Sequence, residues 1–475
     1  MLAAMSASPT PGRESGDRCP GALRLHAADD GALARVRLPG GLLTSHQAEV
    51  LAGLAEELGD GRLDLTSRGN VQLRGLPDGC GAALGGRLRA AGLLPSDRHE
   101  RIRNVVASPL CGLDGPAGPR DARADVADVD VDVAVDVQAW ARALDALLCA
   151  DRAEQQTEAE AETSDLSGLS GRFLFGLDDG RGDIAALAPD VTLIAERDGR
   201  HALLCFGTTG PALRLAVGDA PRAAVLAARA FLAAVRAGGV KAWRVRELTP
   251  EQRPSPERLA ERLAAAGIAC SLVPHVSLVP RVTLPHGPAP QLGLVEGRDG
   301  RWALSLAAPL GRLTAGQWRL LARAAGRDGD GELRVTPWRG IVVPGLTARA
   351  AAAHRAAFAD AGLVVSSGSP WHGAGACAGR PGCAKSLADV RADAAACLTG
   401  TLPGGAGALP VYWSGCERRC GHPGGRWVDV LATDEGYRLA VRDDAARPAP
   451  TRTVPARPVP ARELADAVAA ARTTT

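Results

Sequence analysis

The stretch Pro39–Leu76 begins Pro-Gly-Gly-Leu-Leu-Thr-Ser-His-Gln, and the stretch Pro309–Leu346 begins Pro-Leu-Gly-Arg-Leu-Thr-Ala-Gly-Gln. Aligned at an offset of 270 residues without a gap, the two stretches share 15 identical pairs out of 38. Because Ala, Gly and Leu are frequent in this chain, some of their matches arise by chance. Chance does not explain why Thr, Gln and Pro also match at equivalent positions. We therefore interpret the two stretches as copies of one duplicated unit.

Each copy has the same local pattern. Thr44 and Thr314 stand where N-caps belong, before amphipathic helices predicted over 45–58 and 315–326. A Gly-Asp-Gly turn follows each helix, and two short strands follow each turn. One helix with strands in each copy predicts an α+β half-domain. Two such copies can pair about a pseudo-two-fold axis and form a pocket between them.

The composition limits the class of protein. The 475 residues include 55 Lys and Arg and 53 Asp and Glu, a net charge of +2, and 3% of them are aromatic. The chain therefore lacks both the large basic excess and the many aromatic residues that are typical of nucleic-acid-binding proteins. The sequence has no apolar run of about 18 residues, so we expect no membrane span. Eleven cysteines without a secretory signal indicate a reducing compartment, and we expect a cytoplasmic protein.

Four cysteines carry the sharpest chemical signal. Five residues separate Cys377 from Cys383, and three separate Cys416 from Cys420. Sets of four thiolates hold zinc or iron–sulfur clusters. Zinc sites typically have about two to four residues between paired cysteines, so the five-residue spacing fits zinc poorly, although it leaves both metals open. The other seven cysteines lack paired spacing, and we predict that most are buried as small hydrophobic residues.

Three short segments place arginines beside glycine and polar residues at predicted strand ends. The arginines are Arg68 and Arg74, Arg103, and Arg172. A guanidinium group binds a carboxylate through two parallel hydrogen bonds and keeps its charge when partly buried. A single arginine in this arginine-rich chain is more often a solvated surface residue. A pocket with several of them, however, suits a polyanionic ligand.

Together these motifs resemble the nitrite/sulfite reductase family over about residues 24–440. The resemblance includes the duplicated half-domain, Leu-Thr-Ser-Arg-Gly-Asn-Val-Gln-Leu-Arg-Gly at 65–75, Arg-Asn-Val-Val at 103–106, and the two cysteine pairs. It implies an α+β fold with two pseudo-symmetric ferredoxin-like half-domains and two α/β domains of the siroheme-reductase type.

The resemblance also implies a metal centre and a binding pocket. The implied ligands of a [4Fe–4S] cluster are Cys377, Cys383, Cys416 and Cys420. In that family one cluster cysteine, matched by position to Cys420, bridges to the tetrapyrrole siroheme, and basic residues hold the substrate and the carboxylates. The predicted substrate-binding residues are Arg68, Arg74, Arg103, Arg172, Trp338 and Arg339. The sequence assigns no catalytic residue.

Two departures from the siroheme reductases indicate a branch of the family. Sulfite reductases have two lysines around a phenylalanine where this chain has Arg172-Phe173-Leu174, and the loss of the second cation weakens the case for sulfite or nitrite reduction. The second copy has Thr-Pro-Trp-Arg at 336–339, where siroheme reductases have an amide-rich turn. This turn, together with Asp-Asp-Gly at 178–180, resembles the precorrin-3B synthases of cobalamin biosynthesis.

That branch implies an oxygen-dependent monooxygenase. Its substrates are dioxygen and precorrin-3A, a polycarboxylate tetrapyrrole that is hydroxylated at C20 and closed to a γ-lactone. A one-electron cluster does not insert oxygen by itself, so a non-haem iron, or the substrate acting with the cluster, is also expected. The sequence shows no clear set of two histidines and one carboxylate for that iron. No nicotinamide-binding motif is visible, so we expect an external donor, either a ferredoxin or an NADH-linked reductase.

Two alternatives remain open from the sequence. The first is an assimilatory sulfite or nitrite reductase that binds siroheme, against which Leu174 and the Thr-Pro-Trp-Arg turn count. The second is a non-catalytic iron–sulfur or tetrapyrrole-binding protein. The intact arginine motifs in the first copy and in the turn after it count against that reading.

Composition and repeats also predict the domain organisation. The predicted segments are a disordered tail (1–20), half-domain 1 (21–100), a first reductase-type α+β domain (101–245), a linker with a helix (246–290), half-domain 2 (291–370), an iron–sulfur cluster-binding domain (371–445), and a tail with a final helix (446–475).

Overall fold

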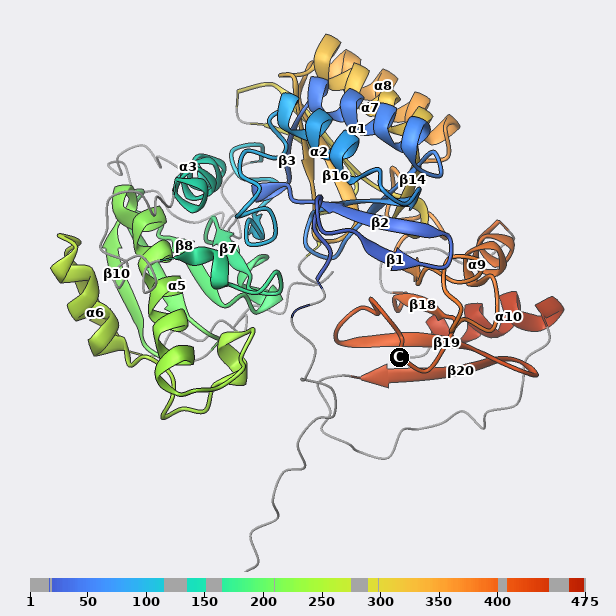
Figure 1. Ribbon diagram of the computed structural model, residues 1–475. Coiled ribbons are helices and arrows are strands. Elements are labelled where there is room, and N and C mark those ends of the chain that lie inside the picture. Colours follow the sequence, from blue (N-terminus) through green and yellow to red (C-terminus); the bar gives the residue numbers. More distant parts are fainter. Residues whose placement is uncertain are drawn as a thin grey trace, which may run out of the picture.

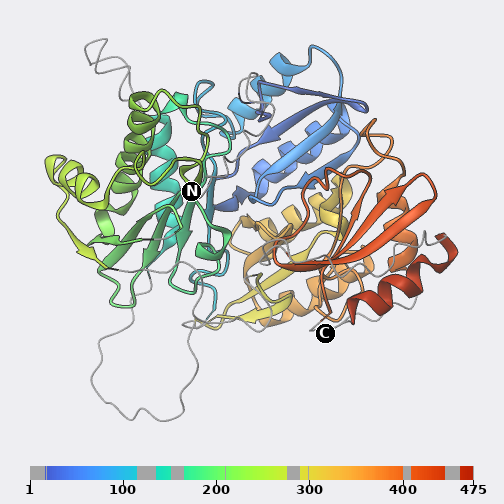
Figure 2. The ribbon, with the colours of Figure 1, turned by 90° about the horizontal axis from the view of Figure 1, so that it is seen from below.

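The computed structural model describes residue 17 and residues 19–114, 135–150, 165–208, 210–274, 289–297, 299–399, 408–443 and 461–473. These residues form a pair of copies, a middle unit and a C-terminal unit (Figure 1), and Figure 2 shows the middle unit and the C-terminal unit each lying against the pair of copies. Most of the tail expected over 1–20 lies outside the described residues. In the part of the chain that the structure describes, no helix is long and apolar enough to cross a membrane.

Each copy of the duplicated unit is a small sheet packed against two helices. The first copy contains β1 (His26–Ala28), β2 (Gly31–Val36), β3 (Leu42–Thr44), α1 (Ser45–Leu58), β4 (Arg62–Leu65), β5 (Val71–Leu76) and α2 (Gly81–Ala90). The second copy contains β12 (Gly293–Glu296), β13 (Trp302–Ala307), β14 (Arg312–Thr314), α7 (Ala315–Asp328), β15 (Glu332–Val335), β16 (Gly340–Leu346) and α8 (Ala348–Asp360). The predicted α+β half-domains are therefore confirmed.

The two copies exchange one strand each. The sheet of the first copy has the order β1-β2-β5-β4-β14, and the sheet of the second has β12-β13-β16-β15-β3. Each sheet thus ends on the short strand that precedes the first helix of the other copy. Because Leu43 pairs with Leu333 and Leu313 pairs with Leu63, the exchange obeys the predicted pseudo-two-fold relation.

The helices after the exchanged strands begin at the predicted caps. Thr44 and Thr314 each accept a hydrogen bond from the backbone N–H three residues later, and the glutamine side chain at that position bonds back to the cap. Helices α1 and α7 then pack against each other in a shared core. Trp318 is fully buried there, and its indole N–H donates to the carbonyl of Ala48, its counterpart in the first copy, at 2.9 Å. A large residue in one copy thus fills the space left by a small one in the other.

The middle unit is a mixed sheet covered by helices. It contains β6 (Val105–Ala107), α3 (Val137–Cys149), β7 (Phe175–Asp178), β8 (Val191–Ala195), β9 (His201–Phe206), β10 (Ala212–Ala216), α5 (Ala220–Ala237), α6 (Pro256–Ala265) and β11 (Cys270–Val273). The strand order is β11-β10-β9-β8-β7-β6, and β6, β7 and β8 run parallel. The three helices share one apolar core with the sheet.

The expectation of a linker over 246–290 needs a correction. Its helix is present as α6, but β11 pairs with β10 and Leu259, Leu263 and Ile268 are buried in the core of the middle unit. The described part of this segment therefore belongs to that unit, because its apolar residues complete the core. Residues 275–288 lie outside the described residues.

The C-terminal unit is a four-stranded sheet. It contains β17 (Ala374–Ala376), α9 (Val390–Leu398), β18 (Val411–Ser414), β19 (Arg426–Thr433), β20 (Gly436–Asp443) and α10 (Ala461–Arg472). The order is β17-β18-β19-β20, and only β20 is antiparallel to its neighbour. The final helix expected in the tail is α10, whose Leu464 and Val468 are buried against this sheet. This unit carries all four predicted metal ligands.

Candidate functional site

The topology of the C-terminal unit gathers the four cysteines. Strands β17 and β18 are parallel, so their carboxyl ends meet at one edge of the sheet. Cys377 directly follows β17, and Gly415 and Cys416 directly follow β18. The N–H of Gly415 donates to the Cys377 sulfur at 3.2 Å. Cys383 and Cys420 lie on the loops that continue from these two strand ends.

The electrostatics indicate that the four thiols share one environment. Burial raises the pKa of Cys420, Arg418 opposes that shift, and the charges of Cys416, Cys377 and Cys383 raise the pKa further. In the described residues, no three of these sulfurs lie within 4.8 Å of one another. Thiolates bound to one zinc at 2.3 Å would lie about 3.8 Å apart. A set of four thiolates at one edge of a sheet is of the kind that binds either zinc or an iron–sulfur cluster.

Arg74 holds the loop that carries Cys383. Its guanidinium forms two hydrogen bonds with Asp30, at 2.9 and 2.8 Å, and also donates to the carbonyl of Gly382 at 2.8 Å. A Cβ at Gly382 would lie 2.7 Å from the Asp30 carboxylate, so only glycine fits there without movement. Arg74 thus fastens the first copy to the cysteine loop.

Arg68 belongs to a group of three guanidinium side chains, one buried (Arg37) and two half-buried (Arg35 and Arg68), for which the described residues supply no acidic partner. Arg68 and Arg37 both donate to the carbonyl of Gly171, at 3.2 and 3.4 Å, and Arg37 also contacts the sulfur of Cys19 at 3.3 Å. Among the ion pairs of the described residues, none includes Arg35, Arg37 or Arg68. Burial lowers the pKa of Arg35 and of Arg68 to about 10, and neighbouring arginines add to this shift.

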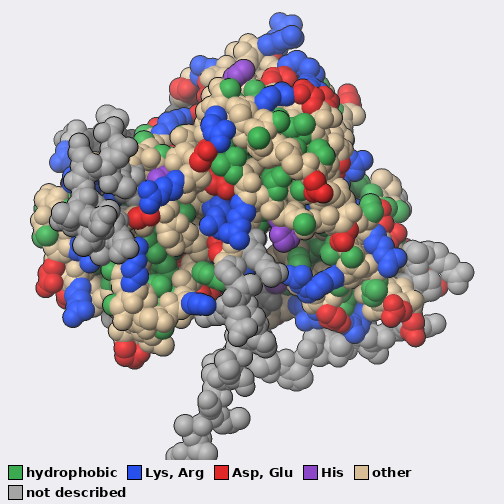
Figure 3. Space-filling model, in the orientation of Figure 1, with side chains coloured by type: hydrophobic (Ala, Val, Ile, Leu, Met, Phe, Trp, Pro, Cys, Tyr) green, Lys and Arg blue, Asp and Glu red, His purple; other side chains and the backbone are tan. Residues whose placement is uncertain are grey.

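This arginine group is equipped to bind an anion. Arg37 is only 2% exposed, and its Nη1 has no hydrogen-bond partner among the described residues. Arg35 and Arg68, with a pKa of about 10, stay charged at neutral pH, so a carboxylate would supply both the missing opposite charge and the missing hydrogen-bond acceptors. Basic side chains also gather near the middle of the face in Figure 3. The sequence motifs did not mark Arg35 or Arg37, although their spacing of two, at the end of β2 and directly after it, was a usable signal.

Arg103 and Arg172 have different surroundings. The side chain of Arg103 is 4% exposed and forms a two-point ion pair with Asp145 on α3, at 2.6 and 2.8 Å. Its remaining nitrogen donates to the carbonyl of Leu93 at 3.0 Å. Arg172 is exposed and stacks on the ring of Trp243 at 4.5 Å. The structure therefore gives Arg103 an internal partner and leaves Arg172 at the surface.

Trp338 contributes to an apolar wall between the second copy and the middle unit. It packs with Leu187 against a buried cluster of Val106, Leu174 and Ile184. The turn that carries Trp338 lies against the turn that carries Arg68, because a Cβ at Gly69 would lie 3.0 Å from the carbonyl of Val335. An apolar wall and the arginine group thus adjoin at the junction of the copies.

Arg339 points to the cysteine loop. Its guanidinium lies 5.8 Å from the ring of Tyr412 and donates to the carbonyl of Gly421 at 2.8 Å. Tyr412 in turn donates its hydroxyl to the carbonyl of Cys420 at 2.6 Å. Burial raises the pKa of Tyr412 to about 12, so the phenol keeps its proton at neutral pH.

Two further groups of possible metal ligands occur in the described residues. One contains Asp178, Asp179 and Asp183, and the other contains Glu196, Asp198 and His201. Neither has the two histidines and one carboxylate typical of non-haem iron oxygenases. Both carry internal partners, such as Arg181 on Asp179 and Arg214 on Glu196. The expected non-haem iron stays a prediction without assigned ligands.

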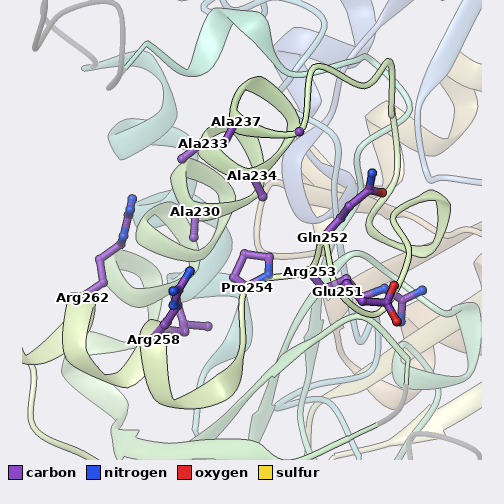
Figure 4. A pocket seen from close by; sticks show the side chains of 12 residues that line it. Ala230, Ala233, Ala234, Ala237, Glu251, Gln252, Arg253, Pro254, Arg258 and Arg262 are labelled. Atoms are coloured by element: carbon purple, nitrogen blue, oxygen red, sulfur yellow. The ribbon is translucent and has the colours of Figure 1, made fainter.

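A cavity of about 420 Å³ lies elsewhere, between α5 and α6 (Figure 4). Alanines from α5 and Arg258 and Arg262 from α6 are among the residues that line it (Figure 4). It contains none of the predicted site residues. We therefore place the candidate site at the cysteines and the adjoining arginine group rather than at this cavity.

Comparisons with known proteins agree with this geometry. The family model described as "Nitrite/Sulfite reductase ferredoxin-like half domain" matches residues 26–89 and 295–361, one match in each copy. The solved structure of the Mycobacterium tuberculosis NirA protein superposes with a TM-score of 0.61 at 16% identity, covering 92% of this chain and 79% of that one. The chain thus has the nitrite/sulfite reductase fold, with two ferredoxin-like half domains.

Curated relatives carry two different names. A precorrin-3B synthase from Sinorhizobium sp is 26% identical over 438 residues, which are 90% of this chain and 83% of that protein. A ferredoxin–nitrite reductase from Synechococcus elongatus is also 26% identical, over 82% of this chain and 74% of that protein. A ferredoxin–nitrite reductase from Leptolyngbya laminosa is 39% identical over 89 residues, which span only 16% of its length.

Each copy matches the half-domain model of the nitrite/sulfite reductase family, the chain has the fold of the NirA protein, and its relatives over most of its length are a precorrin-3B synthase and a ferredoxin–nitrite reductase. The chain is equally identical, at 26%, to a protein named for precorrin-3B synthesis and to one named for nitrite reduction. Sequence identity alone therefore does not choose between the two activities, and the choice depends on the residues of the site.

Proposed function

We propose that the chain is an oxidoreductase of the precorrin-3B synthase type, which hydroxylates precorrin-3A at C20 and closes a γ-lactone. The balanced reaction consumes one dioxygen, two electrons and two protons. One oxygen atom enters the substrate and the other leaves as water. The two electrons come from an external donor, which we propose to be a ferredoxin or an NADH-linked reductase. The proposal includes a cytoplasmic location.

One observation carries the choice of activity. Leu174, at the position where sulfite reductases have the second lysine, is 4% exposed and belongs to the apolar wall with Trp338. Reduction of a small anion such as sulfite or nitrite calls for positive charge at the reacting centre. An apolar wall beside buried and half-buried arginines instead suits a large ligand with an apolar face and a rim of carboxylates.

The roles of the chain's own residues follow from this arrangement. Trp338 and its neighbours would pack on the face of the macrocycle and exclude water from it. Arg68, Arg37 and Arg35 would bind carboxylates of the substrate, because these guanidiniums lack acidic partners among the described residues. Cys377, Cys383, Cys416 and Cys420 would hold a [4Fe–4S] cluster. When bound, the cluster would supply electrons one at a time.

The alternative is a siroheme-dependent sulfite or nitrite reductase. The observation in its favour is the nitrite reductase relative that matches 82% of this chain. The arginine group would then bind the carboxylates of siroheme, and Arg172 would face the anion. The same apolar wall that supports the first proposal counts against this one.

Cofactor analysis of protein purified without oxygen separates the two proposals. Iron, sulfide and extractable tetrapyrrole are quantified, and an absorption spectrum is recorded. A broad iron–sulfur band without siroheme, followed by oxygen-dependent conversion of precorrin-3A, is the expected result. Sharp siroheme bands together with turnover of sulfite or nitrite would overturn the proposal. Full turnover with NADH as the only reductant would refute the external donor.

A further inference from the structure

The duplicated turn differs between the two copies at one strained position. The turn at 66–70 in the first copy and the turn at 336–340 in the second make the same backbone hydrogen bonds. The fourth residue of each has a left-handed conformation, with φ of +64° at Gly69 and +57° at Arg339. Glycine adopts this conformation freely, whereas a residue with a side chain pays about 1 kcal/mol or more. The second copy therefore keeps an arginine where glycine would be more stable.

The side chain of Arg339 runs through a passage lined by glycines. A Cβ at Gly311 would lie 2.4 Å from the Arg339 Cδ, and a Cβ at Gly375 would lie 3.6 Å from its Nη1. A Cβ at Gly421 would lie 3.2 Å from its Nη2. These three glycines come from the second copy, from β17 and from the loop after Cys420. A side chain at position 311 would block the path of this arginine.

The passage ends at the backbone of the Cys420 loop. Arg339 donates to the carbonyl of Gly421 at 2.8 Å, and Tyr412 donates to the carbonyl of Cys420 at 2.6 Å. The loop is also fixed from its other side, because Arg419 pairs with Asp429 at 2.7 Å. Two adjacent carbonyls at a metal-ligating cysteine are thus held by a cation and a phenol.

We propose that Arg339 is a positioning residue that ties the turn of the second copy to the Cys420 loop and raises the reduction potential of the metal centre held there. Its positive charge favours the reduced and more negative state of that centre. Its hydrogen bond to Gly421 restrains the backbone next to the Cys420 ligand. The inference depends on the proposed iron–sulfur cluster but not on the identity of the tetrapyrrole.

The test compares three variants of the full chain with the wild type. Arg339→Gly copies the first repeat, so it removes the tether together with the backbone strain, and the chain is expected to fold. Arg339→Lys keeps the charge, and Tyr412→Phe removes only the phenol. Ala188→Gly is the matched control, because Ala188 is also left-handed, with φ of +52°, and lies in the middle unit.

Three measurements are made on each protein: iron and sulfide per chain, the midpoint potential by redox titration, and hydrogen exchange over 416–422. In Arg339→Gly we expect a melting temperature at or above that of the wild type, a more negative midpoint potential, and faster exchange in this loop. Arg339→Lys should recover part of the potential, while Tyr412→Phe should speed exchange with a smaller change in potential. The control should leave both readouts unchanged.

The outcomes distinguish this inference from the proposed function. An Arg339→Gly protein that retains its iron, its potential and the exchange rate of its loop would overturn the role of Arg339. A wild-type protein that holds no iron and sulfide would instead refute the proposed cluster and, with it, the effect on the potential. In that case an unchanged exchange rate in metal-free Arg339→Gly would refute the tether as well.

Discussion

Replacing Asp145 by alanine should destabilise the middle unit by about 3 kcal/mol, because it leaves the charge of Arg103 buried without a partner. The Arg103 side chain is 4% exposed, and both of its short carboxylate contacts, at 2.6 and 2.8 Å, are to Asp145. Breaking a buried ion pair from one side costs about 3–5 kcal/mol. We take the lower end because the Asp145 side chain is 21% exposed, so water can enter when it is removed.

The assay is urea unfolding followed by tryptophan fluorescence, since Trp140 lies on the same helix as Asp145. Asp145→Asn keeps one acceptor and should lose less than Asp145→Ala. The control is Glu57→Ala at the pair between Arg87 and Glu57, whose side chains are 43% and 58% exposed. An exposed pair of this kind contributes less than about 1 kcal/mol.

The same experiment tests the predicted role of Arg103 in substrate binding. If Arg103 is a structural residue, Asp145→Ala lowers the free energy of unfolding, and the refolded protein binds a tetrapyrrole polycarboxylate as tightly as the wild type. A loss of less than about 1 kcal/mol, together with a clearly changed affinity for that ligand, would refute the reasoning. Arg103 would then belong to the binding site, as its motif predicts.

Three further changes test the fold and its charges. Thr314→Ala removes the cap of α7 and should cost about 1 kcal/mol in urea unfolding, whereas Thr314→Ser should cost much less. Trp318→Ala removes the packing of this side chain against α1 and should lower the free energy of unfolding by about 3–5 kcal/mol. A loss below about 1 kcal/mol would mean that the stability of the paired copies does not depend on this contact. Burial and the charge of Asp178 raise the pKa of Asp183 from 3.8 to about 8, so the folded state binds the extra proton. Stability should therefore fall as the pH rises toward about 8, by at most about 1.4 kcal/mol per pH unit. Asp183→Asn should flatten this dependence, and an unchanged pH profile would contradict it.

The sequence predicted those parts of the fold that depend on local pattern. The repeat, the two threonine caps and the helices α1 and α7 could all be read from periodicity and from residues within a few positions of each other. The cysteine spacing predicts a metal centre, which stays a prediction; the structure places one cysteine of each pair, Cys377 and Cys416, after two neighbouring parallel strands. A strand such as β11 was missed because its pairing with β10 joins residues about 60 positions apart, a distance that no local pattern reports.

Sequence motifs identify some of the arginines but do not reveal their partners in the folded structure. A motif marks Arg103 but does not reveal that Asp145, on a helix 42 residues later, neutralises it. It marks Arg74 but not its ion pair with Asp30 or its contact with the loop of Cys383. Conversely, Arg37 carries no motif, yet it is buried without an acidic partner among the described residues. Which arginine can bind a ligand depends on which carboxylates the fold brings near, and that is a tertiary property.

The two copies of the duplicated turn carry different side chains and so contribute different groups to the candidate site. At equivalent positions the first copy has Arg68-Gly69 and the second has Trp338-Arg339. Because the two turns lie against each other, the exchange of arginine for tryptophan places a cation and an aromatic ring on adjacent parts of one site. The exchange of glycine for Arg339 adds backbone strain and gains a contact with the cysteine loop. Glycine would be less strained at position 339, so the Arg339→Gly variant measures what the arginine contributes to the proposed metal centre in return for that strain.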